Sequence, residues 1–107
     1  MSWKLKYLPE AEGDMKKLDH SQQLVVRKAI QKVQQNPLPQ SEGGFGKPLG
    51  HKAGTNLTGF LKIKLVKEGL RVVYKLIRTE SQMLVIVIGI REDEETYEIA
   101  EKRIKKI

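Results

Sequence analysis

Residues 60–77 read FLKIKLVKEGLRVVYKLI and residues 83–97 read MLVIVIGIREDEETY, and these two stretches decide the fold. The first stretch alternates apolar and polar or cationic residues, and it is interrupted by the sequence Lys67-Glu68-Gly69, where the glycine tolerates the positive φ that a tight reversal needs. Successive side chains of a strand point to opposite faces. The alternation therefore predicts a β-hairpin with one apolar face and one cationic face.

The positive charge of the chain is concentrated on this hairpin. Lys62 and Lys64 share one face of the outgoing strand, and Arg71 and Lys75 share one face of the returning strand. Residues 60–78 contain six Lys or Arg and one acidic residue, within a chain whose net charge is +7. Such a concentration of positive charge favours a polyanionic partner, such as a nucleic acid, an anionic membrane or an acidic protein. Its concentration on one predicted hairpin favours the nucleic acid.

Length and composition exclude several classes of protein. With 107 residues and 39% hydrophobic content, we expect one domain, residues 1–107, with a single core. The chain has no cysteine, so disulfides and thiolate chemistry are excluded. No apolar run approaches the ~20 residues that span a bilayer, and residues 1–9 do not resemble a secretion signal, so we expect a cytoplasmic protein without a membrane partner. His20 and His51 have no carboxylates at ligand spacing, so neither a metal site nor a cofactor is predicted.

The N-terminal part of the chain has the pattern of one strand and two helices. Residues 3–8 alternate as a short strand does, and residues 10–18 have the apolar spacing of an amphipathic helix. Asp19 or Ser21 can cap a second helix, and the glutamine three residues after Asp19 completes a capping box. This helix is expected to end before Pro37. The two helices are predicted to form a hairpin that packs on a sheet.

Residues 37–59 contain six glycines and three prolines, which predicts a long loop. Two interpretations of the basic residues in this loop are open. Either they contact a phosphate backbone, or they are solvated and contact no ligand. Similar contacts are expected from basic residues of the hairpin. The candidate RNA-binding residues are Lys47, Lys52, Lys67 and Lys75.

The C-terminal part predicts a central strand and a final helix. Residues 83–88 are continuously apolar, which indicates a strand covered on both faces. Residues 92–107 begin with acidic residues and end with basic ones, as the helix macrodipole favours. Their apolar stripe is narrow, which indicates a loosely docked helix. The element order β-α-α-β-β-β-α predicts an α+β domain, with an antiparallel sheet, an N-terminal helical hairpin packed on it and a C-terminal helix.

The chemistry-bearing residues suit RNA cleavage without a metal. A serine or cysteine nucleophile paired with a base is missing. Fixed cations stabilise the charge that builds on phosphate oxygens while a base removes the 2′-hydroxyl proton and an acid protonates the 5′ leaving oxygen. About one tyrosine in a thousand is ionised at neutral pH, and nearby cations lower the pKa of a tyrosine. The candidate catalytic residues are Lys62, Lys64, Arg71, Arg91 and Tyr97.

These residues also carry a resemblance to a known family. The segments LKIKL at 61–65, GLRVVY at 69–74 and GIR at 89–91, with Tyr97 six residues later, resemble the RelE branch of the RelE/ParE toxins of type II toxin-antitoxin systems. The similarity covers most of the chain and is strongest over residues 60–104. The two lysines, the two arginines and the tyrosine at matching spacing are more specific than any one segment.

The resemblance implies a RelE-like fold and a ribosome-dependent, metal-independent endoribonuclease. Such an mRNA interferase cuts mRNA in the ribosomal A site through attack by a 2′-hydroxyl, contacts 16S rRNA and is neutralised by a cognate acidic or mixed-charge antitoxin. By position, Tyr97 would be the general base, Lys62 and Lys64 would hold the phosphate, and Arg71 would stabilise the transition state. Arg91 would protonate the leaving group or add further charge stabilisation. In the family, the final helix is the element that an antitoxin tends to displace.

Two other functions remain open. A ParE-like toxin would share the fold, inhibit DNA gyrase and cut nothing, but that branch generally lacks the full set of lysine, arginine and tyrosine residues. A catalytically degenerate module would bind nucleic acid or antitoxin only, with salt-dependent binding and no cleavage.

Overall fold

The computed structural model describes residues 3–52, 55–89 and 93–105, and within these ranges it leaves the side chains of residues 50–58, 93–95 and 97 undescribed. Two short 3-10 turns, Gln40–Glu42 and Arg78–Glu80, accompany the regular elements. The helices and strands are β1 (Lys4–Tyr7), α1 (Pro9–Lys16), α2 (His20–Gln34), β2 (Lys47–Lys52), β3 (Thr55–Leu65), β4 (Leu70–Ile77), β5 (Gln82–Gly89) and α3 (Asp93–Lys105).

The strands form one five-stranded sheet in the order β1-β5-β4-β3-β2. The predicted α+β class is therefore confirmed, and the sheet differs from the expectation in two details. It is mixed rather than antiparallel, because β1 pairs with β5 in parallel while the other three pairs are antiparallel. It also has a strand that was not predicted, β2, which gives the order β-α-α-β-β-β-β-α.

The additional strand lies inside the stretch that was expected to be a loop. β2 and the beginning of β3 both fall within residues 37–59 and pair with each other. Pro48 and Gly50 hide the strand pattern, and the register between β2 and β3 shifts between these two residues. A proline is tolerated there because β2 is an edge strand, whose outer side needs no ladder hydrogen bond.

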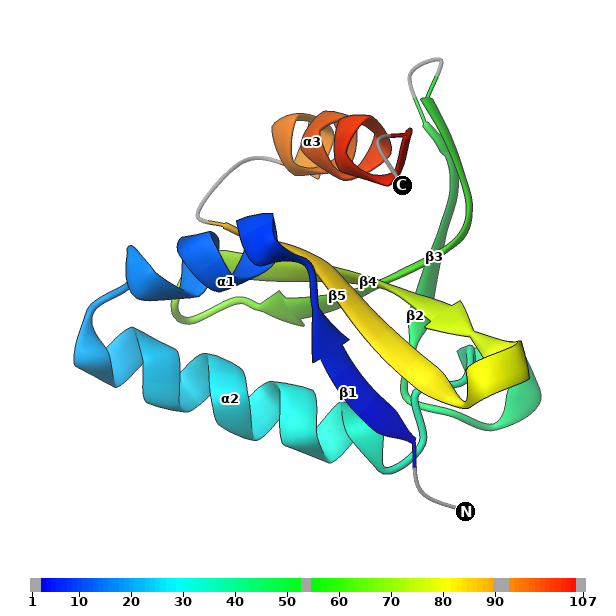
Figure 1. Ribbon diagram of the computed structural model, residues 1–107, viewed down its shortest axis with the longest axis horizontal. Coiled ribbons are helices and arrows are strands. Elements are labelled where there is room, and N and C mark those ends of the chain that lie inside the picture. The colour runs from blue at the N-terminus through cyan, green and yellow to red at the C-terminus, as the bar shows by residue number, and fades with distance from the viewer. Residues whose placement is uncertain (1–2, 53–54, 90–92, 106–107) are drawn as a thin grey trace.

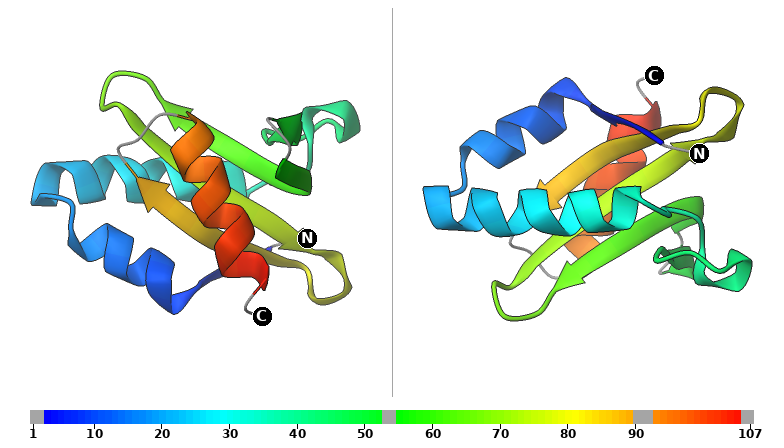
Figure 2. Two further views of the ribbon diagram at one scale, coloured as in Figure 1. Left: turned by 90° about the horizontal axis from the view of Figure 1, so that it is seen from above. Right: turned by 90° about the horizontal axis from the view of Figure 1, so that it is seen from below.

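Two layers of helices enclose the sheet. Figures 1 and 2 show α3 across one face and α2 across the opposite face, with α1 beside the end of β5. Val26 and Ile30 of α2 pack with Leu61, Val72 and other residues of one face. The other face packs Ala100 of α3 against a second cluster, listed here: Leu49, Phe60, Val73, Leu84, Ile86 and Val87.

Several local predictions are confirmed. Asp19 caps α2 through a capping box, in which its carboxylate accepts from the Gln22 amide at 2.8 Å and the Gln22 side chain accepts from the Asp19 amide at 3.2 Å. Gly69 has φ +66° in the turn between β3 and β4. Met83–Ile88 are all buried, as expected for a central strand. None of the helices within the described residues has the length and hydropathy needed to span a membrane.

A buried tyrosine ties the segment before β2 to the sheet. Tyr74 of β4 is fully buried, and its hydroxyl donates to the Pro37 carbonyl at 2.9 Å. A Cβ at Gly46 would lie 2.5 Å from this hydroxyl, so the glycine is needed for the close approach. Burial raises the pKa of Tyr74 well above its ordinary value of 10.0. The hydrogen bond that ties this segment to β4 thus requires a protonated phenol.

We expect Tyr74→Phe to lower the free energy of unfolding by about 1–2 kcal/mol at pH 7, because the Pro37 carbonyl loses its donor. Above pH 10 the unfolded phenol loses its proton while the folded one keeps it, so the stability of the wild-type protein falls as pH rises. The difference between the two proteins should then shrink by roughly 1 kcal/mol per pH unit. Urea unfolding of both proteins at pH 7, 9, 10.5 and 11 measures this difference in the free energy of unfolding. Tyr7→Phe, at a tyrosine that is only half-buried, is the control. An unchanged difference at pH 11 would refute the account.

Candidate functional site

The cationic face predicted for the hairpin is the face of the sheet that α3 covers in part. Lys62 and Lys64 follow Phe60 at every second position of β3, and Arg71 and Lys75 flank Val73 on β4. Phe60 and Val73 both belong to the cluster under α3. Because alternate residues of a strand share a face, the four cations lie on the α3 side. Lys64 is exposed, whereas Lys62, Arg71 and Lys75 are half-buried.

The strand register places cations directly opposite one another. Lys62 of β3 is the partner of Lys47 of β2, and Lys64 of β3 is the partner of Arg71 of β4. Like charges directly opposite one another destabilise a sheet, typically by some tenths of a kcal/mol. Lys47 is thereby brought into the same row as Lys62, although it precedes the hairpin in the sequence. The arrangement forms a two-row cationic surface, which we call the cationic rows: Lys47 and Lys62 in one row, Lys64 and Arg71 in the other.

The remaining predicted residues are placed as follows. Lys67 is exposed in the turn between β3 and β4, beyond the cationic rows. Lys75 lies beside Phe60, with its Nζ 5.5 Å from the ring centroid. Lys52 ends β2 and Tyr97 belongs to α3, and the side chains of both lie outside the described part of the chain. Arg91 lies outside the described residues altogether.

α3 is held on the sheet by a polar contact that no pattern in the sequence predicts. Arg103 of α3 donates to both carboxylate oxygens of Asp14 in α1, at 2.7 and 3.2 Å, and to the Ile86 carbonyl of β5 at 2.8 Å. Asp14 also accepts from the Ile88 amide at 3.0 Å. The side chains of Arg103 and Asp14 are only 18% and 13% exposed. This anchor, the Asp14–Arg103 pair, fixes the helix that carries Tyr97.

The anchor follows from an irregularity of β5. β1 pairs with β5 only as far as Val85, and the register between β4 and β5 shifts between Val73 and Tyr74. The Ile86 carbonyl and the Ile88 amide beyond this point bind the side chains of Arg103 and Asp14. The two residues are 89 positions apart in the sequence, so no local pattern indicates that they meet. In the sequence, both resemble ordinary solvated charges on helices.

The described residues offer no group of three or more His, Asp or Glu that is arranged to hold a metal ion. What they place together is a set of fixed cations next to a helix with a tyrosine. Such a set can bind successive phosphates of a nucleic acid strand and stabilise charge on a phosphate in reaction.

Comparisons with solved structures identify the fold. An arginine-to-alanine double mutant of the E. coli toxin RelE in the free state superposes with a TM-score of 0.74 at 27% sequence identity, covering 97% of this chain and 99% of that chain. The isolated E. coli RelE toxin gives a TM-score of 0.69 at 26% identity, covering 96% and 99% of the two chains. A chain of the RelBE2 toxin-antitoxin complex from Mycobacterium tuberculosis shares the fold, with a TM-score of 0.65 at 20% identity over 87% and 95%. No protein-family model matches the sequence, and no curated protein matches it significantly.

The fold thus places this chain in a class of proteins that share one architecture. It consists of a mixed five-stranded sheet with a helical hairpin on one face and a C-terminal helix on the other. Together with the likeness to E. coli RelE over nearly the whole of both chains, it identifies this chain as a RelE-like member of the RelE/ParE toxin superfamily.

Proposed function

We propose that this protein is the toxin of a type II toxin-antitoxin system and that it acts as a ribosome-dependent, metal-independent endoribonuclease. In this proposal residues 1–107 form a single toxin domain in the cytoplasm, which cuts mRNA in the ribosomal A site and contacts 16S rRNA. The likeness to E. coli RelE supports the toxin. The nuclease activity rests on the residues of this chain.

The observation that carries the nuclease proposal is the register of the cationic rows. Lys47 opposite Lys62 and Lys64 opposite Arg71 violate the pairing preference of a sheet. Proteins keep such local violations chiefly at functional sites. A phosphodiester bound across the two rows would accept charge-assisted hydrogen bonds from cations of both rows. We therefore propose an RNA backbone as the anion that these rows bind.

The proposed reaction uses the predicted residues in the following roles. The phenolate of Tyr97 removes the 2′-hydroxyl proton, and the 2′ oxygen forms a bond to the adjacent phosphorus while the bond from phosphorus to the 5′ oxygen breaks. Lys62 and Lys64 hold the phosphate, and Arg71 stabilises the charge on its non-bridging oxygens. Arg91 either protonates the 5′ oxygen and regains its proton from water, or adds further charge stabilisation while water protonates the 5′ oxygen. The products are a 2′,3′-cyclic phosphate and a 5′-hydroxyl end.

Position 97 suits the role of base. It lies in α3 three residues before Ala100, whose side chain is buried against the sheet on the side of the cationic rows. Cations close to a tyrosine favour its ionised form, which is the form that accepts the proton.

The proposed partner is an antitoxin of acidic or mixed charge. E. coli RelE has been solved in complex with a peptide of its antitoxin RelB, and that structure superposes on this chain with a TM-score of 0.68 at 25% identity. The net charge of +7 favours an acidic segment on the present chain. An antitoxin that covers the cationic rows would neutralise the site.

The test is cleavage of one mRNA, once naked and once on programmed ribosomes, with 5′ ends mapped by primer extension. We expect cuts in the A site only on ribosomes, 5′-hydroxyl ends on the downstream fragments, and no cut when the nucleotide preceding the scissile phosphate carries 2′-deoxyribose. Tyr97→Phe should reduce the rate by about 100-fold or more, because the base is lost.

Absence of cuts from a protein whose circular dichroism shows it folded would refute the nuclease. A DNA gyrase supercoiling assay would then decide for or against the ParE-like alternative. Cuts that persist with the 2′-deoxy substrate would keep a nuclease but contradict the attack by the 2′-hydroxyl.

A further inference from the structure

An exposed aromatic ring lies next to the cationic rows in the sequence. The side chain of Phe45 is 48% exposed. Phe45 stands two residues before Lys47, the exposed lysine at which β2 begins. A single exposed apolar residue is ordinary on a protein surface. At Phe45, however, the surrounding backbone is built so that the ring has to face outward.

The segment that carries Phe45 is fixed by hydrogen bonds of its own backbone. The Phe45 amide donates to the Asn36 carbonyl at 3.0 Å, and the Gly46 amide donates to the Leu38 carbonyl at 3.0 Å. The Gln40 amide donates to the Gly46 carbonyl at 2.8 Å. The backbone that presents the ring is therefore already ordered, and a ligand of the ring does not have to order it.

The glycines on either side of Phe45 both face the protein. A Cβ at Gly44 would clash with the Leu38 carbonyl. A Cβ at Gly46 would lie 2.5 Å from the hydroxyl of the buried Tyr74. Since neither neighbour can carry a side chain there, Phe45 is the residue of the three whose side chain faces solvent.

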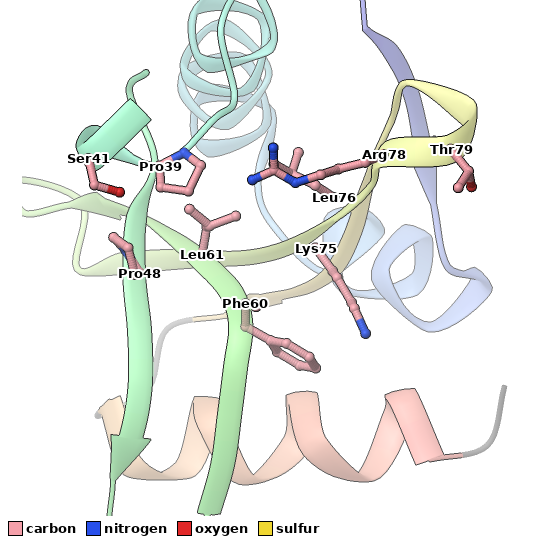
Figure 3. A pocket seen from close by; sticks show the side chains of 10 residues that line it. Pro39, Ser41, Pro48, Phe60, Leu61, Lys75, Leu76, Arg78 and Thr79 are labelled. Carbon is pink, nitrogen blue, oxygen red and sulfur yellow. The ribbon is translucent and has the colours of Figure 1, made fainter. Parts of the chain in front are cut away.

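Phe45 lies on the same side of the sheet as the cationic rows. A Cβ at Gly46 would lie 2.6 Å from the Leu61 side chain, which packs in the cluster on the α2 face. Figure 3 shows Leu61 pointing away from α3 and Phe60 pointing toward it. Because successive residues of a strand point to opposite faces, Lys47 and Phe45 flank Gly46 on the opposite side, which is that of the cationic rows.

The charge around Phe45 suits a phosphate. Residues 35–67 contain one acidic residue, Glu42, and Arg78 holds its carboxylate through two hydrogen bonds at 2.9 and 2.7 Å. Two residues of a strand span about 7 Å, so one nucleotide can place its phosphate on Lys47 and its base on Phe45. Proteins that bind single-stranded nucleic acids combine cations that hold the backbone with aromatic rings on which the bases stack.

We propose that Phe45 is a stacking platform for one unpaired base of the bound mRNA, and that Lys47 holds the phosphate of that nucleotide. The inference rests on the proposed function, since it takes RNA as the ligand of the cationic rows. It adds a contact with a base to residues that otherwise contact only the backbone. Every base has a π-face, so the platform adds affinity with little preference for sequence.

The test is equilibrium binding of a short fluorescent oligoribonucleotide, whose 2′-O-methyl groups prevent cleavage, measured by anisotropy. Phe45→Ala should weaken binding about tenfold, and Phe45→Trp should not weaken it. Phe45→Leu keeps an apolar side chain without the ring and should weaken binding about fivefold. Leu24→Ala is the matched control, because it removes an equally exposed apolar side chain from α2, and it should leave the affinity unchanged.

Two further measurements separate stacking from charge. The same backbone without bases should bind the wild-type protein and Phe45→Ala with equal affinity. Lys47→Gln should lower the slope of log affinity against log salt concentration by about 0.7, the value for one phosphate of a single strand. Phe45→Ala should leave this slope unchanged.

The stacking platform and the nuclease fail in different ways. Equal affinity of wild type and Phe45→Ala for the oligonucleotide, or no binding by either, would overturn the platform and leave the nuclease intact. A tenfold loss that persists with the base-free backbone would also overturn it. Equal losses of Phe45→Ala on programmed ribosomes and on ribosomes without mRNA would overturn the assignment to mRNA. Stacking as expected, with no cut on programmed ribosomes, would refute the nuclease and keep an RNA-binding surface.

Discussion

Replacement of Arg71 by alanine is expected to lower the rate of mRNA cleavage on programmed ribosomes by about 100-fold or more, the size of effect seen when one preorganised donor to a reacting oxyanion is removed. Arg71 is half-buried on β4, between Lys64 of β3 and Gly89 of β5 in the sheet register. A guanidinium held there by the sheet need not reorganise when charge builds on the phosphate. Single-turnover cleavage at saturating protein measures the chemical step separately from binding.

Two variants distinguish the role in catalysis from simple loss of charge. Arg71→Lys keeps the charge but loses the planar fork, so we expect it to retain part of the activity, with a loss of about tenfold. Arg27→Ala removes an exposed arginine from α2, on the opposite side of the sheet, and should leave the rate of the chemical step unchanged. The free energy of unfolding of Arg71→Ala should lie within about 1 kcal/mol of the wild-type value. Equal losses in Arg71→Ala and Arg27→Ala would argue for a general effect of charge.

Replacement of Arg103 by methionine is expected to lower the free energy of unfolding by about 3 kcal/mol, the lower end of the range for breaking a buried ion pair, because the pair retains some exposure. After the substitution the Asp14 carboxylate keeps the Ile88 amide as a donor but loses the guanidinium. The Ile86 carbonyl loses the donor that Arg103 supplies. The apolar stem of methionine fills the space of the arginine stem. Urea unfolding provides the measurement.

The matched control lies two residues further along the same helix, on another side of it. Lys105 forms an exposed pair with Glu101 at 3.0 Å, four residues apart, and Lys105→Met should change stability by less than about 0.5 kcal/mol. Asp14→Asn retains an acceptor for the Ile88 amide and should cost about 1–2 kcal/mol. Equal stability of Arg103→Met and Lys105→Met would show that the Asp14–Arg103 pair does not anchor α3.

Hydrogen exchange tells where the effect of Arg103→Met acts. Loss of the anchor should speed exchange of the Ile88 amide and of the amides of α3, while the amides of α2 on the opposite face change only with global stability. Because α3 carries Tyr97, cleavage should fall in Arg103→Met and stay near wild type in Lys105→Met. A loss of activity in both variants would show that the loss does not arise from breaking the Asp14–Arg103 pair.

Much of the fold follows from local patterns. The period-two alternation of residues 60–77 predicts the hairpin and assigns its cations to one face, and the structure confirms both. The uninterrupted apolar run after Gln82 predicts a strand buried on both faces. Asp19 and the glutamine that follows three residues later predict the start of α2. In each case the physical cause is short-range, because alternation, capping and turn geometry act within a few residues.

Other features depend on segments that are distant in the sequence. β2 is a strand because β3 supplies its hydrogen bonds, whereas its own Pro48 and Gly50 argue for a loop. The parallel pairing of β1 with β5 was not predicted either, since it joins residues almost 80 positions apart.

The candidate site shows the same division. The sequence indicated the candidate residues, and it predicted correctly that Lys62, Lys64 and Arg71 share a face, because neighbouring strands of one hairpin fix that geometry. Only the tertiary structure decided that Lys47 faces Lys62 and that Asp14 meets Arg103. These contacts arise from strand register and helix packing across the whole chain, and no short-range propensity encodes them.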